Sequence, residues 1–131
     1  MKTAYSTLMF ISALSLPAIG AECPAQNFED FAYDFMEHAD IQKRYTQLPL
    51  RVVQGSGDPD IAPTEEMMTA AQLDFPIVEN HATRTQLGYL YVIEDPLTIR
   101  FFTAGTGVLI RYKFQQLDSC WQLIAKEDDS M

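Results

Sequence analysis

Two polar residues near the start of the chain have a spacing that could support acid–base chemistry or metal binding. Asp34 and His38 lie four positions apart, so a helix places them on one face. With His81 from a later segment, they could offer three ligands to a metal ion. Two ligands at this spacing make only half of a zinc site, and the pair also suits an ordinary exposed helical contact. We therefore predict no metal site and no cofactor.

Three further motifs each lack a part of the site they resemble. Ser56 lies between Gly55 and Gly57, but the Asp-Pro that follows cannot open the helix of a nucleophile elbow. Residues 105–107 (Gly-Thr-Gly) have no helix or lysine after them to bind phosphate. Two tyrosines and two arginines of predicted strands could line a pocket, although such residues more often cover a sheet face. These are Tyr89, Tyr91, Arg100 and Arg111. We predict no catalytic residues and do not expect an enzyme.

The most conspicuous charged cluster lies in and after a predicted loop. Residues 55–63 contain two glycines, two prolines and two acids, and two glutamates follow shortly after. The prolines limit the entropy that the loop loses on docking, so its acids suit insertion into a basic cleft. An ordinary solvated loop would have the same composition. The candidate partner-binding residues are Asp58, Asp60, Glu65 and Glu66.

The first 21 residues have the pattern of a cleavable signal peptide. Lys2 precedes an apolar stretch at residues 8–16, Pro17 breaks the helix, and small residues follow. Cleavage after Gly20 and cleavage after Ala21 are both acceptable. An uncleaved membrane anchor is the alternative, but the stretch is shorter than the about twenty residues that span a bilayer. We predict a periplasmic or secreted protein without stable membrane insertion.

The rest of the chain, residues 22–131, is strongly acidic and has the size of a single domain. Without Lys2 it carries 8 basic residues against 18 acidic ones, a formal net charge of −10. This charge excludes nucleic-acid binding through a broad basic surface and favours a basic protein as partner. The oligomeric state stays open.

Export also determines whether the two cysteines stay free or form a disulfide. In a reducing compartment both would stay free, but in an oxidising one a pair usually closes. We predict a disulfide between Cys23 and Cys120, with a linked dimer as the alternative. A redox-active thiol is not supported because the chain has no Cys-x-x-Cys spacing. A lipoprotein is not expected, since Glu22 stands before Cys23 where a small residue is required.

Hydrophobic periodicity predicts helices first and strands afterwards. Asn27 suits an N-cap, and the Phe stripe that follows predicts a helix over residues 27–39. We expect short helices at residues 40–45 and 64–72, with Thr64 capping the latter. Strands are expected at residues 50–54, 86–94, 97–103, 108–114 and 120–125, before an acidic tail at 126–131. Residues 73–80 are ambiguous, and Pro76 favours an edge strand there.

Helices segregated from a run of strands indicate an α+β fold, with the N-terminal helices packed on an antiparallel sheet that ends in a C-terminal meander. The residues expected to join the two layers are Phe28, Phe31, Phe35, Trp121 and Leu123.

This pattern resembles the nuclear-transport-factor-like cone, the fold of ketosteroid isomerase and scytalone dehydratase. The resemblance rests on the Phe-x-x-Phe-x-x-x-Phe opening helix, the Leu48-Pro49-Leu50 entry to the first strand, and the closing Tyr112-Lys113-Phe114 and Trp121-Gln122-Leu123. More narrowly, the chain is similar to exported bacterial domains of unknown function. The resemblance implies a curved, cone-like sheet that hosts enzymes as well as binding modules, so it decides neither.

The sequence therefore favours a non-catalytic exported protein that binds another protein. A specific form is an immunity protein that neutralises a basic toxin directed at the cell wall. The alternative is a small-ligand carrier or a pocket enzyme of the isomerase or dehydratase kind, and a structural envelope component is a third candidate.

Overall fold

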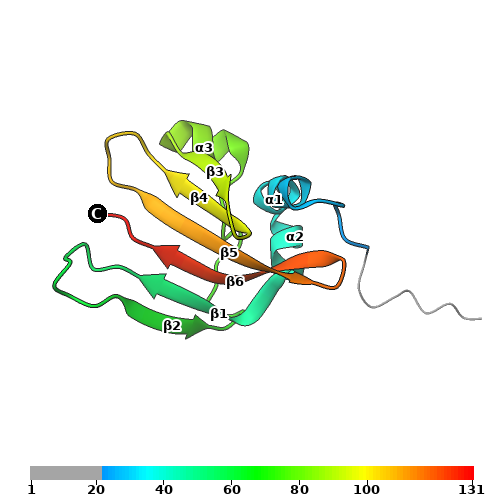
Figure 1. The fold of residues 1–131 in the computed structure, drawn as a ribbon, viewed down its shortest axis with the longest axis horizontal. Coiled ribbons are helices and arrows are strands. Elements are labelled where there is room, and N and C mark those ends of the chain that lie inside the picture. The colour runs from blue at the N-terminus through cyan, green and yellow to red at the C-terminus, as the bar shows by residue number, and fades with distance from the viewer. Residues whose placement is uncertain (1–21) are drawn as a thin grey trace, which may run out of the picture.

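A computed structural model describes residues 22–131 of the chain (Figure 1). The predicted signal peptide, residues 1–21 with the cleavage positions Gly20 and Ala21, lies outside the described residues. Among the helices of residues 22–131, none has the length and hydropathy needed to cross a membrane.

Residues 22–131 form three helices and six strands, with the first two helices ahead of all the strands. They are α1 (Phe28–Glu37), α2 (Ala39–Arg44), β1 (Thr46–Gln54), β2 (Thr64–Met68), α3 (His81–Leu87), β3 (Leu90–Glu94), β4 (Thr98–Phe102), β5 (Leu109–Leu117) and β6 (Cys120–Asp128). The strands form one curved sheet in the order β2-β1-β6-β5-β4-β3 (Figure 1). The meander from β3 to β6 is antiparallel as predicted, whereas β1 lies parallel to β6. The predicted α+β architecture is confirmed.

Aromatic side chains join α1 to the sheet. The rings of Phe31 and Phe35 lie 5.4 Å from Trp121 and 5.0 Å from Phe114, respectively, and Phe28 lies 5.4 Å from Phe114. Leu123 is fully buried in the same core. The five residues predicted to join the layers all lie in this contact, and Phe114 of β5, which was not predicted, completes it.

The first helix begins where the sequence predicts. The backbone N–H of Asp30 donates to Asn27 Oδ1 at 2.9 Å, which satisfies one of the free donors of the helix start. α2 begins at Ala39, one residue before the start predicted from the sequence, and His38 is its N-cap residue.

The predicted helix at residues 64–72 is wrong. Residues 64–68 form β2, which pairs with β1 from Gln54↔Thr64 to Leu50↔Met68. Thr64 followed by two acids is a local signal for a helix start, but the hairpin with β1 satisfies the backbone of the segment with five paired positions instead.

The segment before β3 also differs from its prediction. Residues 73–80 form no strand. Residues 81–87 form α3, a helix that was not predicted, and it includes the first two residues of the strand expected at 86–94. Asn80 Oδ1 accepts from the N–H of Thr83 at 3.0 Å, and Gly88 ends the helix with φ +72°. Glycine adopts this left-handed conformation without strain, so the chain turns there and enters β3. The predicted acidic tail is also shorter, since β6 extends through Asp128.

Candidate protein-binding surface

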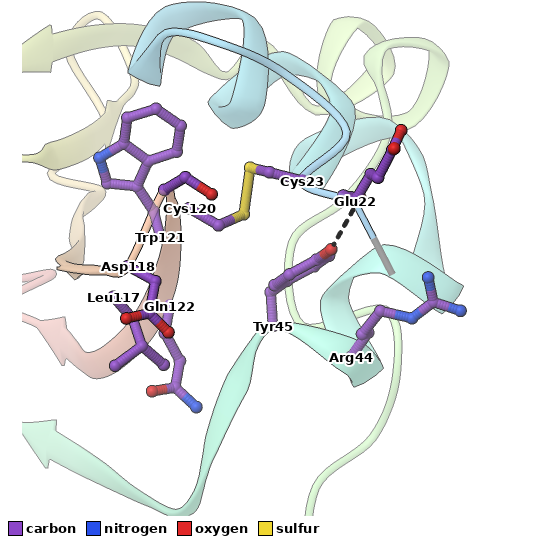
Figure 2. A pocket seen from close by; sticks show the side chains of 10 residues that line it. Glu22, Cys23, Arg44, Tyr45, Leu117, Asp118, Cys120, Trp121 and Gln122 are labelled. Carbon is purple, nitrogen blue, oxygen red and sulfur yellow. Dashed lines mark hydrogen bonds between the residues drawn. A yellow bond between two sulfur atoms is a disulfide. The ribbon is translucent and has the colours of Figure 1, made fainter. Parts of the chain in front are cut away.

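The two cysteines form the predicted disulfide. Cys23 and Cys120 are bonded, with their Cα atoms 5.3 Å apart (Figure 2). No cysteine is left free, so the chain offers no redox-active thiol. The bond fastens the segment before α1 to the first residue of β6.

The interior of the cone is filled by side chains. A small cavity of about 30 Å³ opens beside this core and is lined by residues that include Val78, Arg84, Phe101 and Tyr112. This volume accommodates a water molecule but no organic substrate.

Arg84 and Tyr112, two of the polar residues that line this cavity with Glu79 and Tyr89, are already hydrogen-bonded. Arg84, which is 3% exposed, donates to Glu37 Oε1 at 2.9 Å and to the carbonyl of Glu79 at 2.6 Å. The hydroxyl of Tyr112 donates to the carbonyl of Ile77 at 3.2 Å. Burial raises the pKa of Tyr112 above its usual range, so the phenol stays neutral. Within residues 22–131 no buried side-chain nitrogen or oxygen lacks a partner.

The sequence motifs that suggested chemistry have structural roles. The N–H of His38 donates to the carbonyl of Asp34 at 3.1 Å, which closes the end of α1. The described part of the chain holds no group of three or more His, Cys, Asp or Glu residues suited to a metal. Ser56 Oγ lies 2.8 Å from the carbonyl oxygen of Asp58, inside its own loop. Arg100 and Arg111 both bind Glu94, at 3.1 and 3.2 Å, rather than lining a pocket.

Hydrogen bonds hold the β1–β2 loop in one conformation. Ser56 Oγ accepts from the N–H of Asp58 at 3.1 Å, and Asp58 Oδ1 accepts from the N–H of Asp60 at 2.9 Å. At the base of the loop, the N–H of Gly55 donates to the carbonyl of Asp128 at 2.7 Å. A Cβ at Gly55 would lie 3.1 Å from that oxygen, so glycine permits the close approach.

The four acids singled out in the sequence do not form one patch. Asp58 and Asp60 lie exposed in the loop, whereas Glu65 and Glu66 are consecutive in β2 and point to opposite faces of the sheet. Glu65 is paired with Arg51 at 2.8 Å. The carboxylates free to meet a partner at this loop are therefore those of Asp58 and Asp60.

Two further acids join the loop from the other end of the chain. β6 runs beside β1 and brings Asp128 and Asp129 to Gly55. An open hollow of about 410 Å³ lies between the loop and the last residues, with Asp58, Ile61 and Asp129 among its lining. Figure 1 shows the β1–β2 loop and the C-terminus at the same end of the sheet. We call Asp58, Asp60, Asp128 and Asp129 the acidic end, in which Asp129 also pairs with Arg111 at 3.5 Å; in the sequence only an acidic tail hinted at its second half.

Few basic groups offset the acids. Five of the eight basic side chains in residues 22–131 make ion pairs with acids: Arg51, Arg84, Arg100, Arg111 and Lys113. Lys43 and Lys126 lie over the rings of Phe75 and Tyr112. Because acids outnumber bases in this range by ten, most of the surface carboxylates keep their charge uncompensated.

A second open hollow lies beside the disulfide. It measures about 470 Å³, and its walls include Tyr45, Leu117 and Trp121, with Arg44 at the rim (Figure 2). The hydroxyl of Tyr45 donates to the carbonyl of Glu22 at 3.4 Å, as the dashed line in Figure 2 marks. Its walls are mainly apolar, and it lies on the surface rather than inside the cone.

Comparison with known proteins identifies the fold. No protein-family model matches the chain, and no curated protein is similar to it. A solved structure of an NTF2-like (nuclear-transport-factor-like) protein from Bacteroides fragilis NCTC 9343 superposes with a TM-score of 0.53 at 21% identity. The match covers 84% of this chain and 50% of the other, so the chain spans about half the length of that protein. The chain has the NTF2-like cone fold, as its resemblance implied.

Proposed function

We propose that this chain is an exported, non-catalytic domain that binds a basic protein through its acidic end. The observation that carries the proposal is the filled cone, which leaves about 30 Å³ where enzymes of this fold would hold a substrate. Arg84 and Tyr112 at this cavity are already bonded, and the one carboxylate in its lining, Glu79, belongs to a solvent-exposed residue.

Charge supports a basic partner. The hollow at the acidic end combines carboxylates with Ile61, which is exposed at the loop, so it suits a lysine or arginine beside an apolar side chain. The formal charge of −10 on residues 22–131 would speed the approach of a cationic protein, and added salt would weaken this effect.

Export rests on the predicted signal peptide and agrees with the Cys23–Cys120 disulfide, since such bonds persist in oxidising compartments. Protein recovered from its native host should come from the periplasm or the medium, and its intact mass should lack residues 1–20 or 1–21. A full-length mass with reduced cysteines would contradict export.

The specific form of the proposal is an immunity protein that neutralises a basic enzyme attacking the cell wall. A gene for such an enzyme should then lie beside the gene for this chain. Expression of this chain in the envelope should restore growth of cells that carry the toxin in the same compartment.

The direct test of the interaction uses the disulfide-bonded chain and envelope extract of its host at low salt. We expect one stoichiometric basic partner, whose affinity is then measured against salt. Asp58→Asn with Asp60→Asn removes two charges. The side-chain amide oxygen at position 58 can still accept the hydrogen bond from the N–H of residue 60. We expect about tenfold weaker binding, or about 1.4 kcal/mol.

The matched control removes two charges elsewhere. Asp34→Asn with Asp40→Asn changes the net charge equally on α1 and α2 and should leave the affinity within about twofold. Equal losses in both variants would show nonspecific attraction, and the absence of any stoichiometric partner would contradict the proposed function.

The hollow beside the disulfide supports a second candidate, a carrier of a small ligand. Its apolar walls suit a small apolar ligand, whereas Glu22 and Asp118 beside Arg44 disfavour an anion. Titration with neutral aliphatic and aromatic alcohols should then stabilise the protein against heat, and Leu117→Asp should abolish the shift. A pocket enzyme of the isomerase or dehydratase kind would need the cone interior instead.

A further inference from the structure

The β3 edge of the sheet is apolar, and its side chains are largely exposed although Arg84 of α3 lies over the ring of Tyr91. Within the described residues β3 pairs only with β4, and three consecutive side chains are exposed: Leu90 (53%), Tyr91 (40%) and Val92 (37%). Edge strands of monomers usually carry charges or prolines, or lie under another element, because a bare edge recruits other strands. From Leu90 to Ile93 this strand has no charged residue and no proline.

The charges around β3 favour a second copy of the chain as the partner that pairs with this edge. Most of the acidic surface would repel another copy. Next to β3, however, Glu94 is paired with Arg100 and Arg111, and Arg84 is paired with Glu37. These ion pairs reduce the electrostatic repulsion between two copies at this edge.

The strand is also complementary to itself. An antiparallel pair of β3 strands related by a two-fold axis at Tyr91 places Leu90 of each copy opposite Val92 of the other. The acids at Glu94 and Asp95 then lie at opposite ends of the contact. In a parallel pair, Glu94 and Asp95 of one copy would lie beside the same residues of the other copy and repel them. Charge therefore favours the antiparallel arrangement.

Space for the partner's side chains lies beside the strand. A hollow of about 420 Å³ lies between α3 and β3, and its lining includes Thr85, Gly88, Leu90 and Tyr91. Side chains of a second copy can enter it without displacing the core.

We propose that two copies of this chain pair through their β3 strands, antiparallel and two-fold about Tyr91, to form one continuous sheet. β2 is the opposite edge of each sheet, so both β1–β2 loops point away from the contact. The dimer would present two acidic ends to its partners.

Sedimentation of the disulfide-bonded chain over a range of concentrations tests the proposal. We expect a dimer that dissociates on dilution, and Val92→Lys should raise its dissociation constant about tenfold or more, because the new charge meets an apolar neighbour. The matched control is Met67→Lys on β2, which is 49% exposed and should leave the dimer intact.

A cross-link tests the register. Both native cysteines are bonded, so Tyr91→Cys adds the only free thiol, and the two-fold axis places it opposite its own copy. Oxidation should yield a covalent dimer, whereas Met67→Cys should not. Circular dichroism verifies that each variant is folded.

Three results would overturn the proposal: a monomer at every concentration, a dimer unaffected by Val92→Lys, or a β3 edge covered by a different protein. The Asp58→Asn, Asp60→Asn variant should still dimerise. Loss of partner binding and loss of the dimer are thus separate outcomes.

Discussion

The side chain of Gln42 in α2 forms hydrogen bonds with the backbone of residues 77 and 78, as a neighbouring strand would. Its Oε1 accepts from the N–H groups of Ile77 and Val78 at 2.6 and 3.1 Å, and its Nε2 donates to the carbonyls of Phe35 and Val78 at 2.8 and 3.0 Å. The amide is fully buried, so it accounts for backbone groups that could not otherwise reach water.

Gln42→Leu should destabilise the protein by about 3 kcal/mol, because several buried backbone groups lose their partner at once. Urea unfolding followed by circular dichroism measures the loss. Gln47→Leu, an exposed change of the same type, should cost less than about 0.5 kcal/mol. An equal midpoint for the two variants would contradict this role of Gln42.

Glu127 of β6 gives stability a dependence on pH. Lys113 Nζ lies 2.7 Å from its carboxylate and Arg51 lies 3.6 Å away. The hydrogen bond from Lys113 is the main cause that lowers the pKa of Glu127, and the charge of Arg51 adds to it. The carboxyl group of Glu127 therefore binds a proton more tightly in the unfolded chain than in the folded one. Its contribution to the free energy of unfolding is present at neutral pH and is lost on acidification.

Stability should therefore fall as the pH drops below about 4.5, near the ordinary pKa of a glutamate. Glu127→Gln should lower stability at pH 7 and make this part of the pH profile flatter. Glu66→Gln, on an exposed carboxylate of β2, is the control and should keep the wild-type slope. Parallel wild-type and Glu127→Gln profiles, measured by urea unfolding at each pH, would refute the linkage.

At the scale of elements, α3 is held in place by a residue of α1. Glu37 Oε1 accepts from the N–H of His81 at 3.0 Å and from Arg84 at 2.9 Å. Arg84 also lies over the rings of Tyr91 and Phe101, so one ion pair links α1, α3 and the β3 edge. A helix of seven residues has little stability of its own and depends on such contacts.

Glu37→Ala should cost about 3 kcal/mol, because it leaves the buried Arg84 without its counter-ion. Hydrogen exchange should show the largest loss of protection in α3 and at Tyr89, whose N–H donates to the carbonyl of Arg84. Glu29→Ala, on the exposed side of α1, should change neither quantity. Uniform loss across the sheet would argue against a local role for Glu37.

At the scale of the whole molecule, the disulfide joins positions 97 residues apart. The segment before α1 is thereby tied to β6, which lies between β1 and β5 in the middle of the sheet. Closing so long a loop limits the unfolded chain much more than the folded one.

Cys23→Ser with Cys120→Ser should lower the free energy of unfolding by about 4 kcal/mol in the chain-entropy account. Chemical reduction of the wild type should give the same loss, which separates the bond from the substitutions. Thermal unfolding with and without reductant measures it, and an unchanged Tm on reduction would contradict the prediction.

The acidic end shows the limit of a prediction from sequence. Asp58 and Asp60 were recognisable because they share a loop with prolines and glycines. Asp128 and Asp129 were not, since only the parallel pairing of β1 with β6 brings them to Gly55. Likewise, nothing local indicated that Arg51 would neutralise Glu65.

The sequence by itself determined the features that depend on neighbours along the chain: the Phe face of α1, its Asn27 cap, the alternating strands of the meander and the one pair of cysteines. Only the tertiary structure decided that residues 64–68 are a strand, that 81–87 are a helix, and that the cone is filled. The reason is physical. Short segments have weak preferences of their own, so partners distant in sequence, such as β1 for β2 and Glu37 for α3, determine their final conformation.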